Sequence, residues 1–154
     1  MRRPLIVGNW KMNTTVSEAV ELAKNIRGKL DAATSVTKIL CPPFVSLAPV
    51  HNELIGTTIH VGAQNMHYEN RGAFTGEIAP TMLVDLCSYV IVGHSERRQY
   101  FQETNEIIKT KEIILCSGAW TNQIKNIEID EVPIRPVKGQ MVCLKIPKNN
   151  FFLQ

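Results

Sequence analysis

The chain has 154 residues, of which 44% are hydrophobic and 20% are charged, and its formal net charge is +3. This is the composition of an ordinary globular protein, and the length suits roughly one domain. The Lys and Arg residues are scattered, and no apolar run approaches the roughly 20 residues of a membrane span. We therefore expect neither nucleic-acid nor membrane binding.

The cysteines are widely separated and include no Cys-x-x-Cys pair, which disfavours a zinc site. Three of the four lie in apolar runs, where small buried thiols are typical. The first apolar run, Leu5 to Gly8, is too short for a signal peptide. We therefore expect no metal, reduced thiols and a cytoplasmic location.

The first sixty residues alternate short apolar runs with segments of helical spacing. In chain order we predict a strand at 5–8, a helix at 16–30, a strand at 38–41, a helix at 44–54 and a strand at 58–62. Thr15 and Glu18 form a capping-box pattern at the start of the first helix. Pro49 should kink the second helix or end it early.

The next segment, 64–80, is long and polar and shows neither period. A short helix is predicted at 81–87 and a very apolar strand at 89–93. Ser95 can cap a further helical segment, and 104–111 again shows a helical pattern.

The alternation of strands and helices indicates an α/β fold with a parallel sheet and right-handed crossovers. The strands could close as an open doubly wound sheet or as a barrel. No Gly-x-Gly-x-x-Gly follows the first strand, which disfavours a dinucleotide site.

Past about residue 105 the pattern changes to a β-rich tail punctuated by proline. Strands are predicted at 113–118 and 140–146, without further helix–strand pairs. We therefore divide the chain into 1–110 and a tail, 111–154, that is not an independent domain.

Polar residues follow the first and fourth predicted strands, where α/β proteins keep their sites. Asn9 and Lys11 follow the first strand; His94, Ser95 and Glu96 follow the fourth. A Lys and a His that face one pocket would suit an anionic substrate with a carbonyl group. The helix that follows His94 disfavours its protonated form, so it would act as a neutral hydrogen-bond donor.

Each of these residues also has a purely structural interpretation. Lys11 could be a solvated surface residue, Asn9 a turn residue and His94 a helix cap. Glu96 and Arg98 could form a surface pair of little consequence. The residues alone leave these alternatives open.

Four motifs occur in an order and spacing that resemble the triosephosphate isomerases. They are Gly8-Asn-Trp-Lys-Met-Asn13, Cys41-Pro-Pro-Phe44, Gly62-Ala-Gln-Asn65 running on to Gly72-Ala-Phe-Thr-Gly-Glu77, and Gly93-His-Ser-Glu-Arg-Arg98. The resemblance covers residues 1 to about 110. It implies a partial (β/α)₈ TIM barrel, with the first four or five parallel strands followed by the β-rich tail.

The resemblance also implies an activity and roles for residues. The family interconverts dihydroxyacetone phosphate and glyceraldehyde 3-phosphate in glycolysis and gluconeogenesis, without a cofactor. Asn9 and Lys11 would bind the triose phosphate, and His94 would be the catalytic electrophile beside Lys11. Ser95 and Glu96 would hold these residues in position without contacting the substrate. Thr75, in the long loop 64–80, would contact a neighbouring subunit.

Two parts of that family's site have no matching motif in this sequence. The catalytic Glu follows strand six, and the phosphate-binding amides lie in loops after strands six, seven and eight. Neither Glu128 nor Glu131 lies in a matching motif, so we assign the base to neither. The resemblance therefore predicts an isomerase that is largely inactive, because general-base loss alone typically removes roughly 10²–10⁴-fold.

The tail has a weaker resemblance of its own. Ile113-Ile-Leu-Cys-Ser-Gly-Ala-Trp-Thr121 and Pro133-Ile-Arg-Pro-Val-Lys-Gly-Gln140 resemble FAD-dependent glycine and D-amino-acid oxidases, over about 111–147. The flavin-binding glycine motif is absent, so we expect no FAD. A join between the two families would lie between Thr104 and Lys111.

Two alternatives to an enzyme follow. The chain could be a non-catalytic fragment that self-associates, or docks on an intact isomerase subunit, through residues 64–80. It could also be a fusion remnant without selected function.

Overall fold

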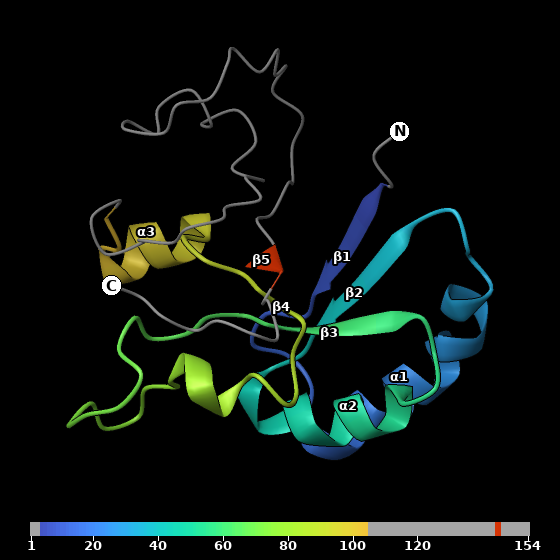
Figure 1. The fold of residues 1–154 in the computed structure, drawn as a ribbon, viewed down its shortest axis with the longest axis horizontal. Helices are drawn as coiled ribbons and strands as arrows, with labels where there is room; N and C mark the ends of the chain where they lie inside the picture. Colours follow the sequence, from blue (N-terminus) through green and yellow to red (C-terminus); the bar gives the residue numbers. More distant parts are fainter. Residues whose placement is uncertain (1–3, 105–143, 146–154) are drawn as a thin grey trace, which may run out of the picture.

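The computed structural model describes residues 4–104 and 144–145, whose strands form one five-stranded sheet in the order β1-β2-β3-β4-β5 (Figure 1). The strands are β1 (Leu5–Asn9), β2 (Thr37–Cys41), β3 (Ile59–Ala63), β4 (Tyr89–Val90) and β5 (Leu144–Lys145). The α-helices are α1 (Val16–Asp31), α2 (Leu47–Leu54) and α3 (Ser95–Phe101), with 3₁₀ turns η1 (Phe44–Ser46) and η2 (Pro80–Met82). Strands β1 to β4 are parallel, as predicted for the first half of the barrel.

The predicted start of α1 is confirmed. The Thr15 Oγ1 accepts a hydrogen bond from the Glu18 N–H at 3.4 Å, and Glu18 Oε2 accepts one from the Thr15 N–H at 2.7 Å. The N–H of Thr15, and its hydroxyl at 2.8 Å, both donate to the Glu18 carboxylate, and these two bonds lower the pKa of that carboxyl. Ala19 and Ala23 have no exposed surface, so small side chains let α1 lie close to the sheet.

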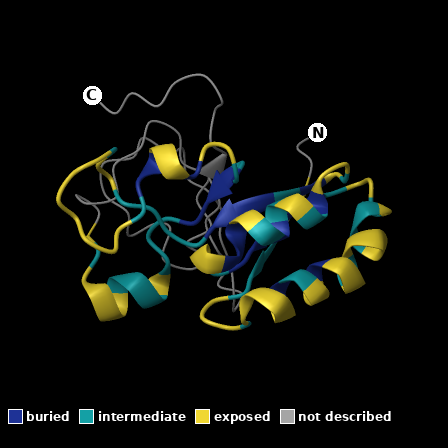
Figure 2. Ribbon diagram, turned by 90° about the horizontal axis from the view of Figure 1, so that it is seen from below, coloured by how far each residue is buried: buried dark blue, intermediate teal, exposed yellow. Residues whose placement is uncertain are grey.

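The sheet has an apolar cluster on each face. The outer cluster lies under α1 and α2, and its largest buried members are Leu40, Leu47, Leu54, Ile59 and Leu83. The inner cluster is Ile39, Cys41, Tyr89 and Ile91, with Leu5 and Val7 packed against it. Figure 2 shows buried segments of the sheet and the exposed outer faces of the helices. Strands β2 and β4 contribute buried side chains to both clusters, whereas no residue of β1 is fully buried.

The amino-terminal end of the sheet is held together by a buried charge. The Lys38 side chain in β2 donates to the Ala33 carbonyl at 2.8 Å and to Thr58 Oγ1 at 2.7 Å. Thr58 in turn donates its N–H and its hydroxyl to Asp31, at 2.7 and 2.6 Å, which lowers the pKa of that carboxyl. The network joins the end of α1 to the starts of β2 and β3.

Several predicted elements differ from the observed ones. Pro49 neither kinks nor ends α2, because it lies in the first turn of the helix. Backbone N–H groups in the first turn have no acceptor within the helix, so the N–H that proline lacks costs no helical hydrogen bond. The helix predicted at 81–87 is replaced by the 3₁₀ turn η2, and β4 is shorter than the predicted strand.

The tail is described only at β5, which lies within the strand predicted at 140–146. β5 pairs antiparallel with β4, whereas the barrel pattern would place a parallel strand there. The helix predicted at 104–111 and the strand at 113–118 lie outside the described residues, apart from Thr104. None of the described helices is long and apolar enough to cross a membrane.

Candidate functional site

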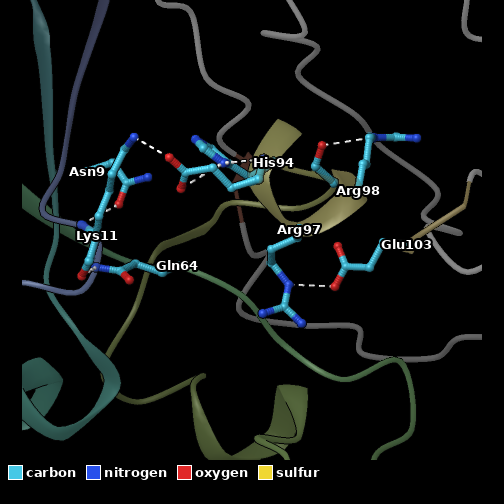
Figure 3. A network of polar contacts seen from close by, with 9 residues as sticks. Asn9, Lys11, Gln64, His94, Arg97, Arg98 and Glu103 are labelled. Atoms are coloured by element: carbon cyan, nitrogen blue, oxygen red, sulfur yellow. Dashed lines mark hydrogen bonds and ion pairs between the residues drawn. The ribbon is translucent and has the colours of Figure 1, made fainter. Parts of the chain in front are cut away.

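The polar residues at the carboxyl-terminal ends of β1 and β4 lie close together (Figure 3). The Lys11 ammonium donates a short hydrogen bond to Glu96 Oε1 and forms an ion pair with it. Glu96 Oε2 lies 3.5 Å from His94 Nδ1. The structure thus brings Lys11, Glu96 and His94 together, although 85 positions separate Lys11 from Glu96.

The backbone of Lys11 has an unusual conformation that fixes where its side chain begins. Its φ of 55° lies in the left-handed region, which costs an L-residue other than glycine roughly 1–2 kcal/mol. The Asn9 Oδ1 accepts a hydrogen bond from the Lys11 N–H at 2.9 Å, and the Gln64 side chain donates to the Lys11 carbonyl at 2.9 Å. Asn9 therefore shapes the turn that directs Lys11 toward α3.

Gln64 is a site residue to which the sequence analysis gave no role. Its amide nitrogen also donates to the Cys41 carbonyl at 2.8 Å, so it joins the ends of β1, β2 and β3. The signal available in the sequence was a polar residue directly after a buried strand, within the Gly62–Asn65 motif.

His94, not Ser95, is the N-cap of α3, and Ser95 is the first residue of that helix. The predicted Ser95 cap is therefore wrong by one position, and the alternative interpretation of His94 as a helix cap is confirmed. His94 Nδ1 accepts a hydrogen bond from the Glu96 N–H at 3.2 Å, which requires an unprotonated Nδ1. In the neutral ring this places the proton on Nε2, and the His94 side chain is only 13% exposed.

Two arginines of α3 make contacts with the segments just before and just after the helix. The Arg98 side chain donates to the Gly93 carbonyl at 2.9 Å, which fixes the turn just before His94. Arg97 pairs with Glu103 at 2.5 Å and lies over the Phe101 ring, 4.8 Å from its centre. Neither contact was predicted from the sequence.

The Lys11–Glu96 contact has a direct electrostatic effect. The hydrogen bond from Lys11 is the largest cause that lowers the pKa of the Glu96 carboxyl below its usual value. A carboxyl whose pKa is lowered in the folded state stabilises that state above its unfolded pKa, near 4.3, and loses the contribution as the pH falls through the folded value. The stabilisation is small because Glu96 is 44% exposed.

Replacement of Lys11 by Met should raise the pKa of Glu96 toward that of an ordinary glutamate. ¹³C NMR of the carboxyl carbon over pH 2–7 measures this directly. Glu18 serves as an internal control, because Thr15 and not Lys11 lowers its pKa. An unchanged Glu96 titration in Lys11→Met would mean that the ion pair is absent in solution.

Thr75 lies away from this cluster. It is exposed in the loop between β3 and η2, which projects from the body of the sheet (Figure 1). In the same loop the centre of the His67 ring lies 4.3 Å from the centre of the Tyr68 ring and 4.3 Å from the centre of the Phe74 ring. Within residues 4–104 and 144–145, no group of three His, Cys, Asp or Glu side chains could hold a metal ion.

Comparisons with known proteins identify one family. The family model for triosephosphate isomerase matches residues 4–134. The chain is 57% identical to a triosephosphate isomerase of Dehalococcoides mccartyi over 111 residues, which are 72% of this chain and 44% of that protein. A triosephosphate isomerase of Herpetosiphon aurantiacus is 44% identical over an alignment of 154 positions, which covers 94% of this chain and 62% of that protein.

A solved structure shows the same fold. The triosephosphate isomerase of Bartonella henselae superposes with a TM-score of 0.65 at 37% identity, over 69% of this chain and 44% of that one. The chain therefore spans less than two thirds of each relative named here. The family match continues to residue 134, past the predicted join at 104–111, and leaves the oxidase resemblance without support.

Proposed function

Because this chain belongs to the triosephosphate isomerase family, we propose that the ends of β1 and β4 form half of a triose phosphate site. The observation that carries this proposal is the network of Lys11, Glu96 and His94, which joins two strand ends. The chain spans about half the length of the first relative named above, so the substrate and activity of a whole isomerase are proposals for this chain.

Lys11 supplies the positive charge in this proposal. Its side chain is 51% exposed, so an anion from solution can reach the ammonium. A fixed ammonium stabilises both the phosphate group and the negative oxygen that develops when a carbonyl becomes an enediolate. Asn9, which holds the Lys11 N–H, lies at the same strand end and would also contact the substrate.

His94 supplies the proton donor. With Nδ1 occupied by the Glu96 N–H, the Nε2–H remains to donate to a substrate oxygen. A neutral imidazole can pass a proton between the two oxygens of the enediolate, and triosephosphate isomerases are themselves the usual example of this chemistry. The reaction moves protons within one molecule, so we propose no cofactor.

Glu96 and Ser95 would not touch the substrate. Glu96 binds the Lys11 ammonium through its carboxylate and His94 through its backbone N–H, so it positions both groups. Ser95 begins α3, whose first turn orients the His94 ring.

We further propose that residues 1–154 do not complete the reaction. No motif of the chain matches the family's base Glu or its later phosphate loops. Without a base the carbon-bound proton has no acceptor, and without those loops the phosphate is poorly oriented.

Triose phosphate binding should depend on the Lys11 charge. We expect Lys11→Met to weaken binding of dihydroxyacetone phosphate at least roughly tenfold, because a charged contact is worth about 1.5–3 kcal/mol. The measurement is a ¹H–¹⁵N NMR titration that follows the amides of α3. Lys24→Met, which removes an exposed charge on α1, is the matched control and should leave binding unchanged. Equal weakening in both variants would indicate non-specific attraction.

A second candidate function is non-catalytic docking, either onto an intact isomerase subunit or onto another copy. The exposed rings of Tyr68 and Phe74, beside Thr75, favour the loop 64–80 as the contact. Co-purification with the Dehalococcoides mccartyi isomerase tests this. Thr75→Arg should abolish it, while Ile55→Arg, at an exposed position of a different surface, should not. Co-purification that survives Thr75→Arg would exclude the loop.

The tail, 111–154, is proposed as an appendage of the half-barrel and not an independent domain. The pairing of β5 with β4 supports this. A cytoplasmic location is also proposed, and the free, buried thiols of Cys41 and Cys87 are compatible with it. A fusion remnant without selected function stays as the alternative, which a sequence of the source DNA across the codons for 104–111 would test.

A further inference from the structure

Arg98 binds the backbone on both sides of His94. Its partly buried side chain donates from Nε to the Gly93 carbonyl at 2.9 Å, a contact marked by a dashed line beside Arg98 in Figure 3. Its backbone N–H donates to the His94 carbonyl at 3.1 Å. One residue of α3 therefore contacts two consecutive carbonyls, which lie just before and just after the ring that serves as proton donor in the proposed function.

The turn before His94 lies beyond the paired part of β4. The register of β4 with β3 ends at Val90, and the Ile91 N–H donates one further bond, to the Ala63 carbonyl at 2.8 Å. Gly93 has a φ of 61°, and glycine occupies this left-handed region about as readily as the right-handed one. The preference of glycine therefore does not select one turn, whereas a charge-assisted hydrogen bond to the Gly93 carbonyl does.

The orientation of the Gly93 carbonyl is linked to the position of the His94 ring. A peptide group is planar, so a bond to the Gly93 oxygen also orients the backbone nitrogen of His94. The Nδ1 of that ring accepts the Glu96 N–H at 3.2 Å, a length near the upper limit for a backbone donor. A small displacement of the ring would therefore weaken the bond that keeps Nδ1 unprotonated.

We propose that Arg98 is a positioning residue for His94. Its guanidinium holds the Gly93–His94 peptide so that Nδ1 stays on the Glu96 N–H and the proton stays on Nε2. The inference rests on the proposed function only for the use of that proton, because Arg98 itself does not touch the substrate. Arginine suits this role because its donors lie in a rigid plane, whereas the lysine ammonium is a single charge on a flexible stem.

The tautomer of His94 tests the proposal directly. Long-range ¹H–¹⁵N NMR spectra of protein labelled at its four histidines, recorded at about pH 8.5 so that free imidazole is unprotonated, distinguish an Nε2–H ring from an Nδ1–H ring. His67 is an internal control in the loop 64–80, since its Nδ1 also accepts the N–H of the second residue after it, at 3.1 Å. His51 marks the opposite tautomer, because its Nδ1 lies 2.9 Å from the Leu86 carbonyl, which can only accept.

Arg98→Met removes the guanidinium and keeps most of the apolar stem. Arg97→Met is the matched control, because it makes the same change one position earlier, where the side chain pairs with Glu103. Arg98→Lys keeps the charge and protects the test if Arg98→Met fails to fold. Circular dichroism checks the fold of each variant.

Arg98→Met should shift the ratio of the His94 tautomers toward Nδ1–H by roughly 2–10-fold, the effect of about one hydrogen bond, and Arg98→Lys should shift it less. Arg97→Met should leave the ratio unchanged, and the His67 signals should be the same in all variants. If Arg98 only attaches α3 to the sheet, the His94 tautomer will be unchanged in every folded Arg98 variant, which would overturn the proposal. An equal shift in Arg97→Met would also overturn it.

Substrate binding separates this proposal from the proposed function. If the wild-type chain binds dihydroxyacetone phosphate, Arg98→Met should bind it more weakly by a factor similar to the tautomer shift, and equal binding would overturn the positioning role. The tautomer is measured without substrate. A shifted tautomer in Arg98→Met, together with no binding by the wild-type chain, would therefore support the role of Arg98 and contradict the proposed function alone.

Discussion

The purified chain should convert glyceraldehyde 3-phosphate at least roughly 10²–10⁴-fold more slowly than a full-length isomerase, because a lost general base alone has an effect of that size. The related enzyme of Dehalococcoides mccartyi is a suitable reference, at 57% identity over the shared residues. A coupled assay that reports dihydroxyacetone phosphate measures both proteins under one set of conditions.

The chief difficulty of that assay is contamination by the isomerase of the expression host. His94→Gln in this chain resolves it, because the variant removes the proposed proton donor and leaves any host enzyme unaffected. Residual turnover that falls further in His94→Gln arises from this site, and turnover that stays constant is contamination. A rate within tenfold of the reference enzyme, lost in His94→Gln, would contradict the proposed inactivity.

The second large effect concerns the inner face of the half-barrel. Ile39→Ala should lower the free energy of unfolding by about 2–5 kcal/mol, because it leaves a cavity among closely packed side chains. Ile39 is only 1% exposed and belongs to the inner cluster with Cys41, Tyr89 and Ile91. Urea denaturation at low protein concentration measures the change.

The matched control for that experiment is Ile55→Ala, which removes the same atoms from a side chain that is 69% exposed. We expect it to change stability by no more than about 0.5 kcal/mol. Similar small effects at both positions would mean that the inner face is not packed in solution. This comparison therefore separates a folded unit from a partly unfolded one.

The elements of 1–104 were largely predictable because their signals are local. The apolar runs that became β1, β2 and β3 end at glycine, proline or a polar residue, and the Thr15 capping box marks the start of α1. Local preference also explains the error at the start of α3. Serine is a much commoner N-cap than histidine, so the sequence favoured Ser95 over His94.

The contacts that complete the site were not predictable, because they join residues far apart in the chain. Gln64 reaches the Lys11 carbonyl across 53 positions, and no spacing rule relates the two. The sequence also did not specify which strand pairs with β4. The period of two in 140–146 predicts a strand but does not specify its partner or direction.

At Lys11, whose backbone is left-handed, the residue that best suits the stability of the turn differs from the residue that best suits anion binding. Glycine there would relax the turn, because it has no side chain to crowd the backbone. It would also remove the ammonium that joins β1 to α3 through Glu96. A search for more stable variants would therefore favour glycine at position 11, and a search for triose phosphate binding would favour lysine. The residue present is the one that makes the fold weaker and gives the strand end a charge.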